Sequence, residues 1–123
     1  MTTGNLLCEV CYRPTTDPIC SRRCQGLLKL KKRLSEDDLR RLVLVEVRKL
    51  PKDSSIAPGP LARIVLDELG GGPTEERDAF SLLRKTLFDL RREGGLRFFQ
   101  KNKLIPKAKG PAEFQGCFEV RGS

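Results

Sequence analysis

The chain is organised by one segment, residues 74–106, which reads TEERDAFSLLRKTLFDLRREGGLRFFQKNKLIP. Its first part repeats an apolar residue every three or four positions: Phe80, Leu83, Leu87 and Leu90. At about 100° per residue these side chains form one stripe on an α-helix. The Gly-Gly pair supplies the positive φ that ends a helix, and the residues after it form a strand that runs into a basic turn. The segment therefore predicts a long amphipathic helix followed by a β-hairpin.

The other sides of this helix are polar, with one aromatic exception. The helical wheel places six residues opposite the apolar stripe or on its flank: Ser81, Arg84, Lys85, Phe88, Arg91 and Arg92. We therefore expect these side chains to face outward. An outward Phe88 is unusual, and it either contacts a binding partner or packs against the N-terminal part of the chain.

Two further helices precede this segment. Ser35 is suited to be a helix N-cap, acidic residues follow it, and apolar residues recur until Pro51 ends the helix. A short strand at Ser55–Ile56 and a helix that begins near Pro60 come next. With a final strand at residues 117–121, the expected order is helix, strand, helix, helix, strand, strand. This is the order of a winged helix-turn-helix domain, so the predicted fold class is α+β, mainly helical with a small β wing.

Four of the five cysteines lie close together near the N-terminus with the spacing C-x2-C-x8-C-x3-C: Cys8, Cys11, Cys20 and Cys24. Zinc binds four thiolates in a tetrahedron, and a C-x2-C turn offers two of them. So short a module cannot bury a core of its own, and the metal would supply its folding energy. We therefore predict one structural Zn²⁺, with reduced structural thiols or another thiophilic metal as the alternatives.

These features divide the chain into three expected parts. Residues 1–28 form a four-cysteine zinc knuckle, residues 29–34 a basic linker or helix, and residues 35–123 the winged helix-turn-helix domain. The whole chain has 24 Lys and Arg against 16 Asp and Glu, and the basic residues concentrate at its two ends. A polyanion that binds both ends is the simplest physical reason for this distribution. Solubility alone and an acidic protein partner are the alternatives.

Several classes of protein are not indicated by the sequence. No apolar run approaches the roughly 20 residues that span a bilayer, and the N-terminus has no signal or transit pattern. We therefore expect an intracellular protein without a membrane partner. The chain has no His, and it shows neither a nucleophile elbow nor a spaced pair of buried carboxylates. We therefore expect no enzymatic activity and no small-molecule substrate.

The cysteine segment resembles treble-clef zinc knuckles, which share the pattern C-x2-C followed by C-S-x-x-C, here Cys20-Ser21 to Cys24. It is similar to a small bacterial zinc-knuckle family that includes a DNA gyrase inhibitor, although Ile19 stands where that family has an aromatic residue. The resemblance covers roughly 18 residues and implies the zinc fold rather than one function, because zinc modules of this kind serve many partners.

The C-terminal two thirds of the chain, from about Leu42 to Arg121, resemble a family of uncharacterised bacterial winged-helix domains. The matching stretches include the Ile56-x-Pro58 turn and Lys109-Gly110-Pro111 before the last strand. In that family the domain can accompany a Cys-rich knuckle. The resemblance implies the fold and carries no established activity.

Together these features favour a nucleic-acid-binding protein that acts on double-stranded DNA, in transcription or in DNA and chromatin transactions. The long helix would enter the major groove, with Lys85 and Arg92 near the bases and Ser81 at a base or a phosphate. The flanking Arg84, Phe88 and Arg91 would contribute to the same contact. Phosphate contacts are expected from two basic stretches: Lys101, Lys103, Lys107 and Lys109 in the wing, and Lys29, Lys31, Lys32 and Arg33 after the knuckle.

Two other functions remain open at the level of sequence. The chain is alternatively a protein-interaction adaptor in a larger machine, with Phe88 and Phe98–Phe99 as anchors. RNA or ribosome binding is the further alternative, because charge alone does not separate RNA from DNA.

Overall fold

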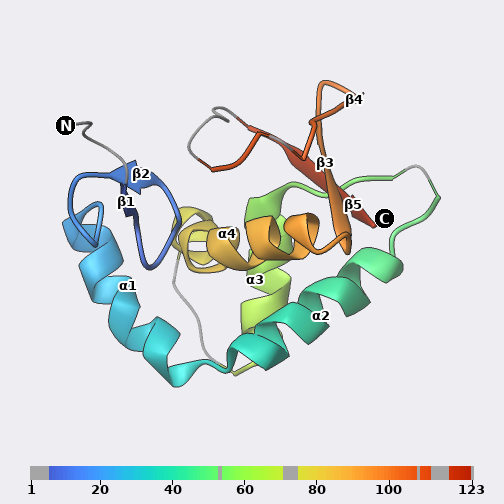
Figure 1. Cartoon of the computed structure of the whole chain (residues 1–123). Helices are drawn as coiled ribbons and strands as arrows, with labels where there is room; N and C mark the ends of the chain where they lie inside the picture. Colours follow the sequence, from blue (N-terminus) through green and yellow to red (C-terminus); the bar gives the residue numbers. More distant parts are fainter. Residues whose placement is uncertain (1–5, 53, 71–74, 108, 112–116, 123) are drawn as a thin grey trace.

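The computed structural model describes residues 6–52, 54–70, 75–107, 109–111 and 117–122. Within these ranges the chain has an α+β fold with four helices and two small antiparallel sheets (Figure 1). The helices are α1 (Arg22–Arg33), α2 (Glu36–Arg48), α3 (Pro58–Glu68) and α4 (Glu76–Arg92). The strands are β1 (Leu6–Leu7), β2 (Pro14–Thr15), β3 (Leu96–Gln100), β4 (Lys103–Leu104) and β5 (Glu119–Gly122). The expected α+β class is confirmed.

Serine caps fix the starts of the first two helices. The Ser21 hydroxyl accepts a hydrogen bond from the Cys24 N–H at 3.3 Å, and the Ser35 hydroxyl accepts one from the Asp38 N–H at 3.3 Å. The cap predicted at Ser35 is therefore confirmed. At the other end of the helical region Gly94, with φ at 90°, follows the last turn of α4.

The second sheet is larger than the sequence indicated. Its order is β4-β3-β5, and Ile56 adds a single antiparallel bridge to Val120 on β5. The expected strand at Ser55–Ile56 is reduced to this bridge, whereas β4 is an additional strand. Lys101 and Asn102 have φ of 52° and 66°, the left-handed conformation of a two-residue hairpin turn, and this turn reverses β3 into β4.

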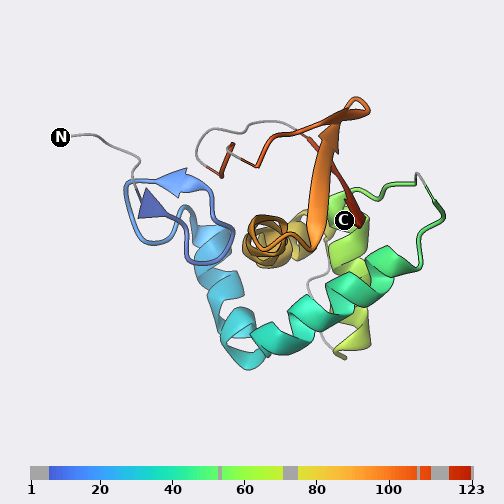
Figure 2. The same ribbon diagram turned by 45° about the vertical axis from the view of Figure 1, so that its right-hand side comes forward.

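Helix α4 lies at the centre of the molecule. Figures 1 and 2 show α1 on one side of it, α2 and α3 on the other, and the second sheet across it. The expected apolar stripe is confirmed at Leu83, Leu87 and Leu90, which are at most 3% exposed. The expectation that the opposite side faces outward is wrong for most of its residues, because ten of the 17 residues of α4 are buried.

In the described ranges, none of the helices is both long and apolar enough to cross a membrane.

Candidate metal centre and basic surfaces

The four clustered cysteines meet at one point in space. Their Sγ atoms all lie within 4.8 Å of one another, and the Cys20 Sγ is 3.5 Å from the Sγ atoms of both Cys11 and Cys24. Cys8, Cys11 and Cys24 are buried and Cys20 is half-buried. All four thiols are free, so no disulfide accounts for the cluster. The residues that hold this cluster, 6–24, are called the cysteine module below.

Two local structures bring the thiols together. The β1–β2 hairpin presents Cys8 and Cys11 from one tight turn, in which the Tyr12 N–H donates to the Cys8 carbonyl at 2.9 Å and Tyr12 has φ of 68°. The Ser21 cap starts α1 immediately after Cys20, which places Cys24 in the first helical turn. The C-x2-C turn expected from the sequence is therefore present, whereas Cys20 lies just before α1 and only Cys24 lies in its first turn.

The donor set suits a thiophilic metal ion. Four sulfurs bound to one Zn²⁺ at about 2.3 Å would lie about 3.8 Å apart in a tetrahedron. The observed separations, 3.5 Å for two pairs and at most 4.8 Å for the others, are close to that value. The Val10 N–H also donates to the Cys8 Sγ at 3.4 Å, which is a contact that stabilises a thiolate. The four thiols thus lie close together in an arrangement that can hold a metal ion, and the cluster has no other ligand type that would identify the metal.

The thiols differ in how readily they ionise. Burial alone would raise the pKa of Cys8, but backbone hydrogen bonds from Cys11, Cys20 and Val10 outweigh it and lower this pKa to about 6. Burial raises the pKa of Cys11 to about 11, and burial followed by a hydrogen bond with Cys20 raises that of Cys24 further. Because a metal binds thiolates, ion binding must displace protons from Cys11 and Cys24 near neutral pH.

The cysteine module is attached to the helices by three basic side chains. The Arg84 guanidinium of α4 donates to the Cys11 carbonyl at 3.0 Å, and the Lys31 Nζ of α1 donates to the Val10 carbonyl at 3.2 Å. Arg23 in α1 forms an ion pair with Asp78 in α4 at 3.3 Å. The module therefore packs on α4, an arrangement that the sequence left open.

Four of the expected nucleic-acid contacts are buried in the chain itself. Ser81, Arg84, Phe88 and Arg91 are between 3% and 7% exposed, so the surface position expected for them is wrong. Arg84 contacts the cysteine module, and the Arg91 guanidinium donates to the Lys109 carbonyl. The Phe88 ring packs on the sheet, 5.1 Å from the Phe98 ring.

The aromatic anchors expected for a protein partner are buried for the same reason. Phe98 is fully buried and Phe99 is 8% exposed. The Phe98 ring stacks at 4.3 Å on Phe118, which closes the core between α4 and the sheet. An exposed apolar side chain nevertheless exists beside them, since Leu104 on β4 is 57% exposed.

The other expected contacts are exposed or half-buried and lie on the wing, on α1 and on α4. The wing lysines, Lys101, Lys103, Lys107 and Lys109, are all exposed. On α1, Lys29, Lys32 and Arg33 are exposed, whereas Lys31 is half-buried in its contact with Val10. On α4, Arg92 is exposed but forms an ion pair with Asp89 at 3.1 Å, and Lys85 is half-buried over the Tyr12 ring.

An arginine pair on the outer face of the second sheet was missed by sequence reasoning. Arg97 on β3 and Arg121 on β5 are direct cross-strand neighbours. Their guanidinium carbons lie 5.5 and 4.1 Å from the centre of the Phe99 ring. Neither is within 4.0 Å of a carboxylate in the described ranges. Alternation along β3 puts Arg97 and Phe99 on one face, but only the register reveals that Arg121 joins them.

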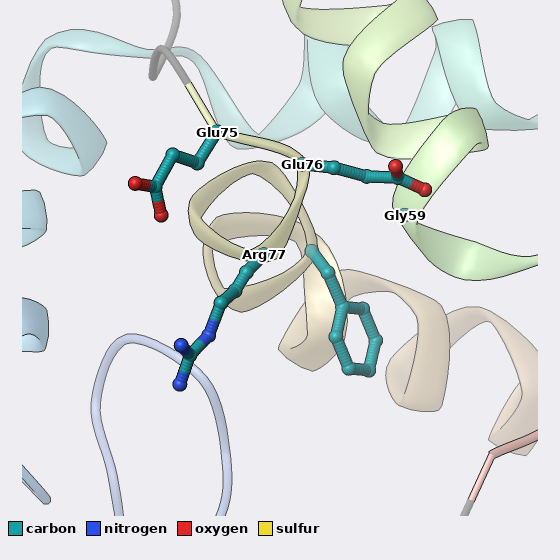
Figure 3. A pocket seen from close by; sticks show the side chains of 5 residues that line it. Gly59, Glu75, Glu76 and Arg77 are labelled. Carbon is teal, nitrogen blue, oxygen red and sulfur yellow. The ribbon is translucent and has the colours of Figure 1, made fainter.

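A shallow pocket lies at the N-terminal ends of α3 and α4, lined by Gly59, Glu75, Glu76, Arg77 and Phe80. Figure 3 shows the Glu76 side chain extending from α4 towards Gly59 in the first turn of α3. The α3 N-cap, Ala57, has no side-chain cap. The Glu76 carboxylate therefore lies where the positive end of α3 favours a negative charge, and we assign this contact a structural role.

No protein-family model matches the chain, and no curated protein matches it either. The chemistry of the candidate sites is therefore the basis for any functional proposal.

Proposed function

We propose that this is a nucleic-acid-binding protein with a structural zinc module, and that it binds the phosphate backbone through its wing. The zinc part of the proposal is supported by four free thiols gathered within 4.8 Å, with no His or carboxylate in the cluster. Zinc with four thiolate ligands has no open position, so its role is to stabilise the module rather than to catalyse a reaction.

The C-terminal part is proposed to be a winged helix. In support, α2, the Ile56 bridge, α3, α4, β3 and β5 follow one another in the order of that fold. In most helix-turn-helix domains the last helix enters the major groove. Here α4 is covered by α1 and by the cysteine module, which disfavours that mode and makes the wing the better candidate for the contact.

The observation that carries the proposal is a set of basic side chains on the wing and the second sheet. The four wing lysines are exposed, and the arginine pair Arg97 and Arg121 lies on the same sheet without a carboxylate partner in the described part of the chain. Like charges that face each other across two strands are unfavourable. A phosphate between the two guanidiniums would remove that repulsion, because Arg binds phosphate through paired N–H groups.

The test is fluorescence anisotropy of the zinc-loaded protein with duplex DNA, single-stranded DNA and structured RNA at several salt concentrations. We expect binding that weakens steeply with salt, because each phosphate contact releases counterions. Arg97→Gln with Arg121→Gln should lower the affinity for all sequences alike. The control is Arg77→Gln, which removes one exposed charge at the far end of α4. Absence of binding at about 50 mM salt, where such contacts are strongest, would contradict the proposal.

The exposed Leu104 supports a second candidate function, an adaptor that binds an acidic protein through the same wing. Leu104 lies next to Lys103, so that a partner would meet one apolar side chain within a basic surface. Under this alternative Leu104→Ala abolishes capture of an acidic partner, while nucleic acid is not bound at any salt concentration. Preference for folded RNA in the anisotropy experiment would instead indicate RNA as the ligand.

A further inference from the structure

The cysteine module receives two buried or half-buried positive charges from outside itself. Arg84 comes from α4 and Lys31 from α1. Their head groups donate to carbonyls of consecutive residues, Cys11 and Val10, within the turn that carries the first two thiols. Two helices far apart in sequence therefore direct cations at one short loop.

Neither cation has an acidic partner in the described ranges. Arg84 is 7% exposed, and besides the Cys11 carbonyl its guanidinium contacts the Phe88 ring at 4.8 Å. No carboxylate lies within 4.0 Å of Arg84 or of the Lys31 Nζ in the part of the chain that the structure describes. Burying a charge is costly unless another charge or several hydrogen bonds compensate it. Both side chains therefore need negative charge nearby. The ionisable groups that act favourably on Arg84 are the thiols Cys11, Cys20 and Cys8, whereas Glu36 and Asp89 act on Lys31 together with Cys8.

A metal ion bound by four thiolates supplies negative charge beside Arg84 and Lys31. A divalent ion with four thiolates carries a formal charge of −2, which is more negative than the cluster without a metal. Arg84 and Lys31 together carry +2. We propose that these two residues are the counter-charges of the metal centre, so that a divalent ion both completes the cysteine module and attaches it to α4.

This inference rests on the proposed metal centre, and it has a consequence for the whole chain. Without the ion, Arg84 is buried between the cysteine module and α4 beside a less negative cluster, and the attachment of the two becomes less favourable. With the ion, the same guanidinium favours attachment. Metal occupancy therefore controls whether the side of α4 that carries Arg84 is covered.

The test compares Arg84→Met with Arg77→Met, a change on an exposed arginine of the same helix. Methionine retains an unbranched apolar stem and removes the charge. We expect Arg84→Met to weaken Zn²⁺ affinity by roughly 10- to 100-fold, the usual effect of losing an outer partner of a metal site. Affinity is measured by competition with a chelator. The corresponding pair on α1 is Lys31→Met with the exposed Lys29→Met as its control.

A second measurement separates a counter-charge from a residue that only fills space. Urea unfolding is followed for each variant with zinc and with a chelator. We expect Arg84→Met to destabilise the zinc-loaded protein but to leave the metal-free protein unchanged or more stable, because the unpaired charge is gone. An equal loss of stability in both states would overturn the proposal. So would equal zinc affinities for Arg84→Met and Arg77→Met in a protein that binds zinc. If the unchanged protein binds no divalent ion, the metal centre itself is wrong and this inference falls with it.

Discussion

At the scale of single residues, Cys24 is the thiol that joins the cysteine module to α1. It lies in the first turn of the helix, its Sγ is 3.5 Å from that of Cys20, and it is buried. We expect Cys24→Ser to weaken zinc binding strongly, because a neutral hydroxyl is a poor replacement for a thiolate ligand. The melting temperature should then no longer respond to added zinc, since the metal supplies the folding energy of so small a module.

Cys117 provides the control for this change. It is exposed and lies outside the four-thiol cluster, so Cys117→Ser removes one thiol without touching the proposed ligands. Bound zinc per chain and the melting temperature with and without a chelator are measured for both variants. A zinc affinity of Cys24→Ser equal to that of Cys117→Ser would show that the cluster is not a four-thiolate site.

Asn102 tests the turn that creates the additional strand β4. Its φ of 66° lies in the left-handed region, which Asn tolerates and β-branched residues avoid. Asn102→Val should therefore destabilise the protein by about 1–2 kcal/mol, and Asn102→Gly should be close to neutral or stabilising. Both are measured by urea unfolding. Because Asn102 is exposed, the two substitutions do not differ through packing in the core. Equal stability of the two variants would mean that the turn does not adopt the left-handed conformation.

At the scale of elements, the N-terminus of α3 is stabilised by a residue from α4. The Glu76 carboxylate extends towards the first turn of α3, which has no cap of its own (Figure 3). Glu76→Ala should reduce stability by about 0.3–1 kcal/mol, the usual value of a charge at a helix end. Glu68→Ala is the matched control, because Glu68 lies at the negative end of the same helix, where loss of an acid is neutral or favourable. Urea unfolding at low salt measures both, and an equal effect of the two changes would refute the helix-end explanation.

The sequence predicted the elements better than their surroundings. The period of Leu83, Leu87 and Leu90 correctly indicated a helix with one apolar stripe, and Ser35 correctly indicated where α2 begins. Periodicity within one helix cannot show that α1 and the cysteine module cover its opposite side. A helical wheel places Arg84 on the polar, outward side of the helix. In the structure its guanidinium is buried against the cysteine module, where the Cys11 carbonyl accepts its hydrogen bond.

The candidate sites divide in the same way. The metal-binding arrangement was predictable, because the four thiols are local in sequence and the C-x2-C and C-x3-C spacings limit their geometry. The arginine pair was not, because Arg97 and Arg121 are 24 positions apart (121 − 97) and meet only through strand register. A single-residue slip would move Arg121 to the other face of the sheet, so no property of the residue alone places it there.

At the scale of the whole molecule, the two basic surfaces are separated. Figures 1 and 2 place α1 and the β3–β4 hairpin on opposite sides of α4. The sequence led to the expectation that one polyanion binds both basic ends of the chain. This arrangement makes simultaneous contact of one duplex with both surfaces unfavourable. We therefore expect only one of the two basic surfaces to bind the duplex.

Two charge-matched triple variants test which of the two basic surfaces binds the duplex. Lys101→Gln, Lys103→Gln and Lys107→Gln change the wing, while Lys29→Gln, Lys32→Gln and Arg33→Gln change α1, and all six side chains are exposed. Each set lowers the formal net charge from +8 to +5 (8 − 3). The long-range attraction of a polyanion is therefore reduced equally, and any difference between the sets reports direct interactions with phosphate. We expect the wing set to reduce the slope of log affinity against log salt by about 0.9 for each duplex phosphate that the protein no longer neutralises. The α1 set should leave that slope close to that of the unchanged protein. Equal slopes for the two sets would mean that net charge rather than the wing determines binding, and a larger reduction in the α1 set would move the interface to α1.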